Sequence, residues 1–287
     1  MEYENEYQQY SNSQYECLLF DVDDTLYPYS SGLSAQCTKN ITEYMIEKLK
    51  IEDSKVPDMC VQLYKDYGTT MSGLRAIGYD FDYDDYHSYV HGRLPYEEKL
   101  RPDPVLRNLL HSLPIRKVIF SNANDAHVAT VLKILGIEDC FERIVCFESL
   151  NPTHNSNISD GQESEELKVP DVSSGMDSDT SADSPLPKSP VICKPFENAF
   201  EEAFKIADIN PKKTLFFDDS LRNLQTAKCM NLHTVLIGSS HRSTGVDYAL
   251  ESIHNIREAL PELWEELKKA EGVPYSGKAG IETTVRA

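Results

Sequence analysis

The sequence has few of the features that mark secreted, membrane or zinc-binding proteins. Its seven cysteines are scattered singly with no Cys-x-x-Cys pair, which argues against a disulfide framework and a zinc site. No apolar run approaches the ~18 residues that a membrane helix needs. The N-terminal stretch MEYENEYQQYSNSQYE has neither an apolar segment nor an arginine, so it predicts no secretory signal or transit peptide. We expect a cytoplasmic protein, although the sequence does not separate the cytoplasm from the nucleus.

Basic residues are also scarce. Lys and Arg total 28 against 47 Asp and Glu, which gives a formal net charge of -19. Nucleic acids and anionic membranes are themselves negative, so neither is an expected partner. At 287 residues the chain can hold one sizeable core with a smaller domain, and its 40% hydrophobic content predicts that part of it lies outside a core.

The most informative stretch is CLLFDVDDTLYP, residues 17–28. Its first four residues form an apolar run that is typical of a buried parallel strand. The run ends at Asp21, Asp23 and Asp24, and such neighbouring carboxylates repel one another unless a cation lies among them. The carboxyl end of a parallel strand is also where ligands bind in open α/β sheets. An acidic, solvated turn is the alternative interpretation of this stretch alone.

Apolar runs alternate with helical patterns along the rest of the chain. This alternation predicts an α/β fold, a doubly wound (Rossmann-like) parallel sheet of about five strands with right-handed crossovers. The expected strands are residues 17–20, 117–120, 144–147, 214–217 and 234–237. A last helix is expected over residues 252–269.

Residues 29–104 show helical patterns and no strand, so we expect an inserted helical domain, which we call the cap. Residues 151–190 hold nine Ser, five Pro and eight acidic residues with no aromatic one, a composition that predicts a disordered acidic insert. Its serines beside acidic residues are candidate sites for a phospho-regulated partner, with solvated filler as the simpler interpretation. The core then comprises residues 16–28, 105–150 and 191–270, and residues 1–15 and 271–287 are expected to be tails.

Polar residues follow further strands or precede a helix. Ser121 and Asn122 follow the second strand, where a hydroxyl and backbone amides suit a phosphate oxygen. Lys194 stands immediately before a helix and would neutralise negative charge. Asp218 and Asp219 follow the fourth strand, and paired carboxylates there are oxygen ligands suited to magnesium.

In this order the four motifs resemble those of the haloacid dehalogenase-like (HAD) phosphohydrolases. The resemblance implies that Asp21 attacks phosphorus and forms an aspartyl-phosphate, while Asp23 acts as general acid and then as general base. It assigns Ser121 and Asn122 to phosphate binding and Lys194 to neutralising the phosphate and the nucleophile. An acid at position 23 argues against a dehalogenase, whose reaction needs no leaving-group proton.

The same resemblance implies one Mg²⁺ as cofactor. Its expected ligands are Asp21, Asp219 as the firmest, Asp218 as an auxiliary one and Asp23 through its main-chain carbonyl. Asn223 is expected beside the phosphate, where it would orient the ligand shell.

The cap resembles that of HAD enzymes that act on small molecules, and two of its stretches resemble the pyrimidine 5′-nucleotidase branch, which includes proteins labelled suppressor of disruption of TFIIS-like. These stretches, YGTTMSGL and HGRLPY, make Thr69, Thr70 and Arg93 candidate substrate contacts. The alternative is that their glycines merely turn the chain. His87 and His91 have a spacing that can bind zinc, but with no third ligand nearby we interpret them as a pair on a helix surface.

The sequence therefore predicts a magnesium-dependent phosphomonoesterase whose substrate is a small phosphate ester, a nucleoside 5′-monophosphate in the first place. The alternatives are a phosphatase or phosphomutase that acts on another small ester, and a non-catalytic regulatory binding protein.

Overall fold

The computed structural model describes residues 14–152 and 186–264. A six-stranded sheet with the order β3-β2-β1-β4-β5-β6 lies at its centre, and every neighbouring pair of strands is parallel. The strands are β1 (Cys17–Phe20), β2 (Arg116–Phe120), β3 (Arg143–Val145), β4 (Thr214–Asp218), β5 (His233–Ile237) and β6 (Tyr248–Leu250). The predicted doubly wound parallel sheet is confirmed.

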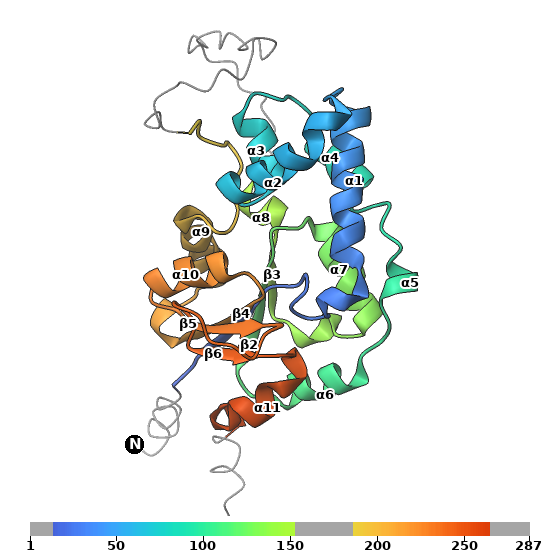
Figure 1. Cartoon of the computed structure of the whole chain (residues 1–287). Helices are drawn as coiled ribbons and strands as arrows, with labels where there is room; N and C mark the ends of the chain where they lie inside the picture. The colour runs from blue at the N-terminus through green and yellow to red at the C-terminus, as the bar shows by residue number, and fades with distance from the viewer. Residues whose placement is uncertain (1–13, 153–185, 265–287) are drawn as a thin grey trace, which may run out of the picture.

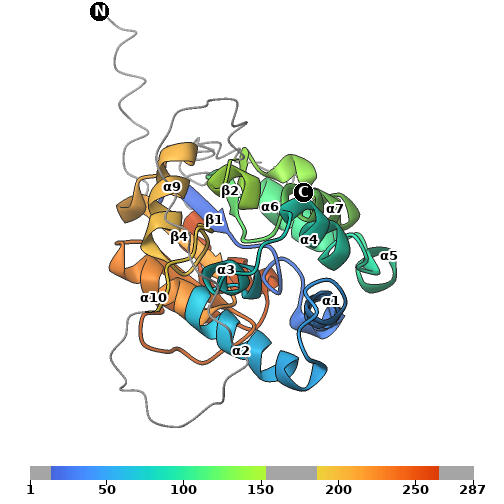
Figure 2. The same cartoon turned by 90° about the horizontal axis from the view of Figure 1, so that it is seen from above.

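Helices cover both faces of the sheet. Successive side chains of a strand point to opposite faces, and in β1 Leu18 and Phe20 pack on one side while Cys17 and Leu19 pack on the other. The first face is covered by α6 (Pro104–Ser112), α7 (Asp125–Leu135) and α11 (Ile256–Ala259), and the second by α9 (Glu197–Ala207) and α10 (Leu221–Cys229). Figure 2 shows α9 and α10 on one side of the strands and α6 and α7 on the other. Because both faces are buried, β1 is a continuous apolar run.

Five of the α-helices that lie between β1 and β2 in the chain form the cap. They are α1 (Leu33–Glu47), α2 (Val56–Tyr67), α3 (Thr70–Ala76), α4 (Tyr83–Val90) and α5 (Tyr96–Lys99). Residues of α1 to α4 share an apolar cluster of their own, which Phe147, Val191 and Cys193 of the core also join. Figure 1 shows these four helices above the sheet.

The cap contacts the core closely at the turn between α2 and α3. A side-chain carbon at Gly68 would lie only 2.3 Å from the main-chain oxygen of Lys194, so a larger residue would force the two apart. The guanidinium of Arg222, in α10, donates to the main-chain oxygen of Lys65 at 2.7 Å and lies over the ring of Tyr64. This end of the cap therefore rests on the segment that carries Lys194.

The structure corrects several sequence predictions. β6 was not predicted, and Phe147 begins the short helix α8 (Phe147–Leu150) instead of ending a strand. The segment expected as one helix from residue 252 is broken into η5 (Ile253–Asn255), α11 and η6 (Pro261–Trp264), with Pro261 interrupting the main-chain hydrogen bonds.

Two predicted boundaries also differ. Tyr15, assigned to the tail, is buried against the ring of His233, and Ser189, assigned to the acidic insert, is hydrogen-bonded to Ser72 of the cap at 2.8 Å. The remaining expectations for the tails and the insert fall mainly on residues 1–13, 153–185 and 265–287, which lie outside the described residues. No helix in the described part of the chain has the length and apolar character that crossing a membrane requires.

Candidate active site

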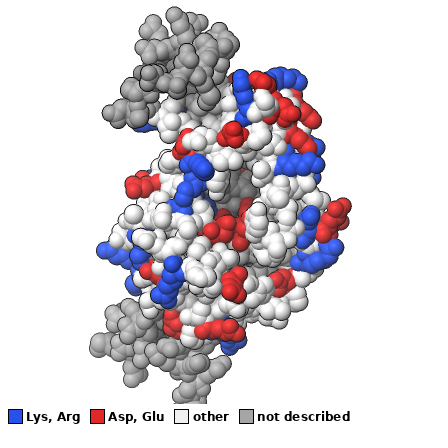
Figure 3. Space-filling model, viewed as in Figure 1, with Lys and Arg blue, Asp and Glu red and all other residues white. Residues whose placement is uncertain are grey.

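Three adjacent strands deliver polar residues to one cavity. Asp21 follows β1, Ser121 follows β2, and Asp218 and Asp219 stand at the end of β4. Because the strands are parallel and neighbouring, their carboxyl ends meet at one edge of the sheet. A cavity of about 430 Å³ lies between this edge and the cap. Figure 3 shows acidic side chains gathered in the hollow between the upper helices and the sheet.

Lys194 is the cation of this edge. Its Nζ donates to Oδ1 of Asp21 at 2.7 Å, to Oδ2 of Asp218 at 2.9 Å and to the main-chain oxygen of Phe120 at 2.7 Å. Burial acts against the charge, but the two carboxylates outweigh it and raise the pKa of Lys194. Asn122 fixes the main chain of Lys194 from both sides, because it donates to its oxygen at 3.0 Å and accepts from its N–H at 2.8 Å.

A compact set of carboxylates can hold a metal ion. Single oxygens of Asp21, Asp218 and Asp219 lie within 4.8 Å of one another. Asp218 is fully buried and accepts hydrogen bonds from Nδ2 of Asn223 at 3.1 and 3.0 Å, whereas Asp219 is accessible and lines the cavity. An all-oxygen, anionic donor set suits a hard cation such as Mg²⁺.

The same crowding changes proton affinities. Burial, partly opposed by Lys194 and reinforced by the Asp218 carboxylate, raises the pKa of Asp21 to about 7. Partial desolvation by the surrounding protein and repulsion from Asp218 and Asp21 raise the pKa of Asp219 to about 9. Both carboxyls therefore favour a compensating positive charge at this place.

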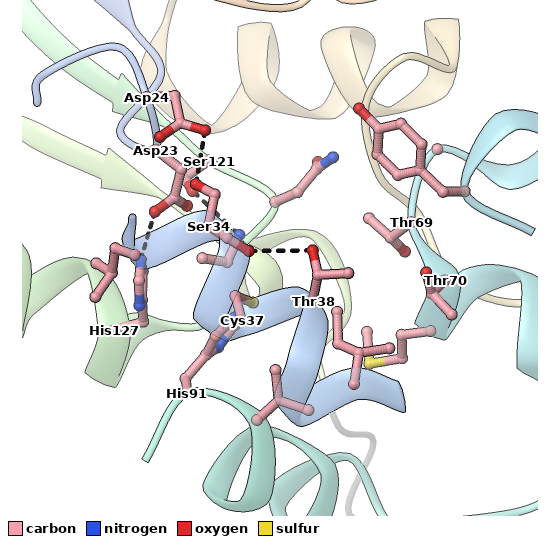
Figure 4. A pocket seen from close by; sticks show the side chains of 18 of the residues that line it. Asp23, Asp24, Ser34, Cys37, Thr38, Thr69, Thr70, His91, Ser121 and His127 are labelled. Atoms are coloured by element: carbon pink, nitrogen blue, oxygen red, sulfur yellow. Dashed lines mark hydrogen bonds and ion pairs between the residues drawn. The ribbon is translucent and has the colours of Figure 1, made fainter. Parts of the chain in front are cut away.

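Asp23 is held apart from these carboxylates. Its Oδ1 accepts from the hydroxyl of Tyr27 and lies 2.7 Å from Nε2 of His127, in the first turns of α7. Burial alone would raise its pKa, but the charge and hydrogen bond of His127 hold the pKa of Asp23 well below its usual range. Figure 4 shows His127 pointing at Asp23, with Ser121 nearby.

Asp24 is turned toward the cap. It has a positive φ of 57°, and its Oδ2 accepts from the hydroxyl of Ser34 in α1 at 2.6 Å. This backbone conformation places Asp24 differently from its neighbours Asp21 and Asp23, so the sequential trio splits into three separate sites.

Ser121 and Asn122 both line the cavity. The buried hydroxyl of Ser121 accepts from the N–H of Ala123 at 3.1 Å, which shapes the turn into α7. Both the amide nitrogen and the amide oxygen of Asn122 are hydrogen-bonded to the main chain of Lys194, so the Asn122 side chain has a structural role here.

The structure separates the three cap residues that the sequence singled out. Thr69 and Thr70 line the cavity, and Thr69 caps the N-terminus of α3 by accepting from the N–H of Ser72 at 3.1 Å. Arg93 is not among the described residues that line the cavity. Its guanidinium pairs with Glu43 at 2.9 Å and lies over the ring of Tyr89.

The histidines differ from the sequence interpretation. His87 is buried, so the expectation that His87 and His91 form a pair on a helix surface is wrong. Burial, together with nearby His127, lowers the pKa of His87 to about 4, and the pKa of His91 falls to about 3 for the same reasons. The sequence analysis did not identify His127 or Tyr96 as site residues. The hydroxyl of Tyr96 lies 2.8 Å from Nδ1 of His127. A histidine in the first turns of the helix after the second strand was the available signal.

A second group of possible ligands lies elsewhere. His111, Asp139 and Cys140 are close together, with His111 and Asp139 exposed. Both terminal nitrogens of Arg107 already pair with the Asp139 carboxylate. This group is therefore a weaker metal site than the strand-end carboxylates.

Comparison with curated proteins finds a relative at low coverage. The chain is 29% identical over 132 residues to Phosphate metabolism protein 8 of Saccharomyces cerevisiae. The match covers 44% of this chain and 41% of the yeast protein, so the chain aligns with less than half of that relative. No family model matches the chain.

Solved structures give the fold. CbbY from Rhodobacter sphaeroides in complex with phosphate has a TM-score of 0.50 at 15% identity, with 87% of this chain and 99% of that chain covered. A HAD phosphatase from Thermococcus onnurineus (TM-score 0.49, 14% identity, 85% and 96% covered) and L-2-haloacid dehalogenase from Xanthobacter autotrophicus (0.47, 12%, 85% and 97%) are also similar. The chain therefore has the α/β fold of the CbbY structure. A shared fold does not by itself determine the reaction.

Proposed function

We propose that this protein is a magnesium-dependent phosphomonoesterase that forms an aspartyl-phosphate and acts on a nucleoside 5′-monophosphate. The observation that carries the proposal is the buried Lys194, which binds Asp21 and Asp218 at once while Asp219 faces the same cavity. This edge of the sheet therefore holds the Lys194 ammonium and more carboxylates than that single cation neutralises. It suits a phosphate only when a second cation joins it.

Each residue then has a defined part in the reaction. A carboxylate oxygen of Asp21 attacks phosphorus, the bond from phosphorus to the ester oxygen breaks, and Asp23 gives its proton to the departing oxygen. Asp23 next takes a proton from water, whose oxygen attacks phosphorus and releases phosphate and free Asp21. Lys194 holds Asp21 in place and offsets its charge. When bound by Asp21, Asp218 and Asp219, Mg²⁺ would supply further positive charge for the phosphate oxygens.

The position of Asp23, and not its lowered pKa, fits a hydrolysis that ends in a protonated alcohol. Its carboxylate is separate from the metal-binding group and partly exposed, with 36% of its side chain accessible. A dehalogenase releases halide, which needs no proton, so it has no use for an acid at this position. The acid therefore favours a phosphatase among the reactions that this fold performs.

The lining of the cavity favours a substrate with a single phosphate and a neutral leaving group. Lys194 is the only Lys or Arg among the described residues that line it. The side toward the cap is apolar or uncharged, with Leu33, Ile41, Met71 and Leu94 among its members. A second phosphate or a carboxylate would meet no cation there. A nucleoside suits a mostly apolar cavity of this size, because its base offers a flat apolar face and a few hydrogen-bonding groups.

Phosphate release measured with a panel of esters tests the proposal. Wild-type protein with Mg²⁺ is expected to release phosphate from UMP or CMP faster than from sugar phosphates, bisphosphates or pyridoxal phosphate, and Asp21→Asn serves as the blank. Release that peaks on another ester would keep the chemistry and refute the nucleotide. A phosphomutase would return an isomer without free phosphate. No release from any ester would refute the phosphatase.

We further propose a reducing intracellular compartment and a separate partner for the acidic insert. The location is supported by the seven cysteines, all of which are free thiols. The partner is supported by the composition of residues 151–190. Deletion of residues 153–185 tests the second proposal, because it should abolish binding of the partner while leaving phosphate release unchanged.

A further inference from the structure

A chain of hydrogen bonds joins the candidate acid to the cap. Oδ1 of Asp23 lies 2.7 Å from Nε2 of His127, and Nδ1 of His127 lies 2.8 Å from the hydroxyl of Tyr96. Asp23 belongs to the loop after β1, His127 to α7 of the core and Tyr96 to α5 of the cap. The hydroxyl of Tyr27 also donates to Oδ1 of Asp23.

The chemistry of these groups limits the direction of each bond. The Asp23 carboxylate only accepts, so Nε2 of His127 must carry the hydrogen that points to it. When His127 is neutral, its Nδ1 accepts from the hydroxyl of Tyr96, and when His127 is protonated, Nδ1 donates to that hydroxyl. Oδ1 of Asp23 thus receives two hydrogen bonds, from His127 and Tyr27. Oδ2 of Asp23 is left free to exchange a proton with the leaving group.

We propose that His127 is the positioning residue for Asp23, with Tyr96 of the cap setting the plane of its ring. The inference rests on the proposed phosphatase reaction, since it concerns the step in which the leaving oxygen is protonated. His127 does not need to touch the substrate for this. It keeps Oδ1 occupied and turns Oδ2 toward the cavity that Asp23 and His127 both line.

The surroundings of His127 limit its freedom to do anything else. Its side chain is only 3% exposed, and its ring lies against the ring of His91 at 4.6 Å. His91 is itself held through Nδ1 by Asn124 at 2.6 Å. The imidazole is therefore fixed on three sides and can serve as a rigid donor. Because Tyr96 comes from the cap, the orientation of Asp23 is coupled to the position of α5.

Two esters with different leaving groups distinguish a loss of Asp23 positioning from a general loss of activity caused by damage to the fold. Departure of a nucleoside alkoxide from UMP needs protonation, whereas p-nitrophenolate leaves without it. His127→Leu is expected to lower kcat on UMP by about 10²-fold, the scale of lost general acid catalysis, with little change in KM. On p-nitrophenyl phosphate the first step should be nearly unaffected, so the loss measured as the burst of p-nitrophenolate should be much smaller.

Conservative variants and a remote control complete the test. His127→Gln keeps an N–H donor near the position of Nε2 and should recover most of the UMP activity. Tyr96→Phe keeps the ring but loses the hydroxyl, so it should show the same selective loss in a weaker form. His254→Leu removes a histidine that pairs with Asp103 away from the cavity, and it should leave the ratio of the two activities unchanged.

The outcomes distinguish this inference from the proposed function. Equal losses on both esters in His127→Leu, or no recovery in His127→Gln, would refute the positioning role while the phosphatase stands. If His127→Leu does not fold, Tyr96→Phe decides by the same ratio. A wild-type protein that hydrolyses neither ester would refute the phosphatase and this inference together.

Discussion

The ammonium nitrogen of Lys194 lies 2.7 Å from Oδ1 of Asp21, and both side chains are buried. The same nitrogen reaches Asp218 at 2.9 Å, so one cation stands between two carboxylates at the ends of neighbouring strands. A buried cation of this kind is costly to desolvate, and its carboxylates are costly to leave unpaired. The arrangement therefore couples the integrity of the core to the chemistry of the site.

Lys194→Met is expected to lower the free energy of unfolding by about 3–5 kcal/mol, because Asp21 and Asp218 would remain buried without their partner. Urea denaturation measures this. Lys228→Met is the matched control, since the pair of Lys228 with Asp247 is partly exposed and its loss should cost at most about 1 kcal/mol. Similar losses in the two variants would contradict the central position of Lys194.

The two acidic residues after β4 should differ sharply when each is neutralised. Asp219→Asn should weaken Mg²⁺ binding at least about tenfold with little effect on stability, because its side chain is accessible and not paired with Lys194. Asp218→Asn should destabilise the fold, because Asp218 is fully buried and accepts from Lys194 and Asn223. Calorimetric titration with Mg²⁺ and thermal unfolding of the two variants check this. A loss of metal binding confined to Asp218→Asn would reverse the assignment.

Mg²⁺ affinity is expected to rise with pH. The pKa of Asp21 is raised to about 7 and that of Asp219 is raised as well, so protons compete with the cation at low pH. As the pH rises through about 7, Asp21 loses its proton and the site gains negative charge, which favours the metal. Titrations between pH 6 and pH 8 should show stronger binding at the higher pH, with protons released on binding. Affinity that does not change over this range would contradict the raised pKa values.

Asp21→Asn and Asp23→Asn should both abolish turnover of nucleotides for different reasons. The first removes the nucleophile, while the second removes the proton donor and should cost about 10²–10⁴-fold in kcat. Circular dichroism should show an intact fold in both variants. Mass spectrometry of protein quenched during turnover should detect a phosphorylated residue in the wild type and none in Asp21→Asn. Full activity in either variant would refute the mechanism.

Arg93→Ala should leave KM for a nucleotide unchanged, because the Arg93 side chain pairs with Glu43 and does not line the cavity. Met71→Trp is the contrasting variant. Met71 lines the cavity, and the larger indole side chain of Trp at this position should obstruct the leaving group and raise KM for nucleotides. Steady-state kinetics of both variants check this. A KM that rises in Arg93→Ala would return Arg93 to the substrate contacts.

Much of the site could be predicted from the sequence because its residues stand directly at strand ends. Apolar runs that stop at Asp21, Ser121 and Asp218 identify both the strands and the edge of the sheet at which they end. In a parallel sheet those ends share one edge, so three local patterns predict one place. The strand β6 was beyond this reasoning, since its three residues, Tyr248–Leu250, with only Leu250 buried, carry too short a pattern.

The local sequence by itself determined the alternation of strands and helices, the carboxylates and hydroxyls at their ends and the position of the cap in the chain. Tertiary structure alone decided which partners these groups have. It brought His127 to Asp23 across 104 positions and Tyr96 to His127 across 31, and it turned Arg93 toward Glu43. It also paired Asp218 with Lys194 and placed Asp219 at the cavity. Periodicity records which face of an element is buried, whereas a hydrogen bond between distant elements depends on how the whole chain packs.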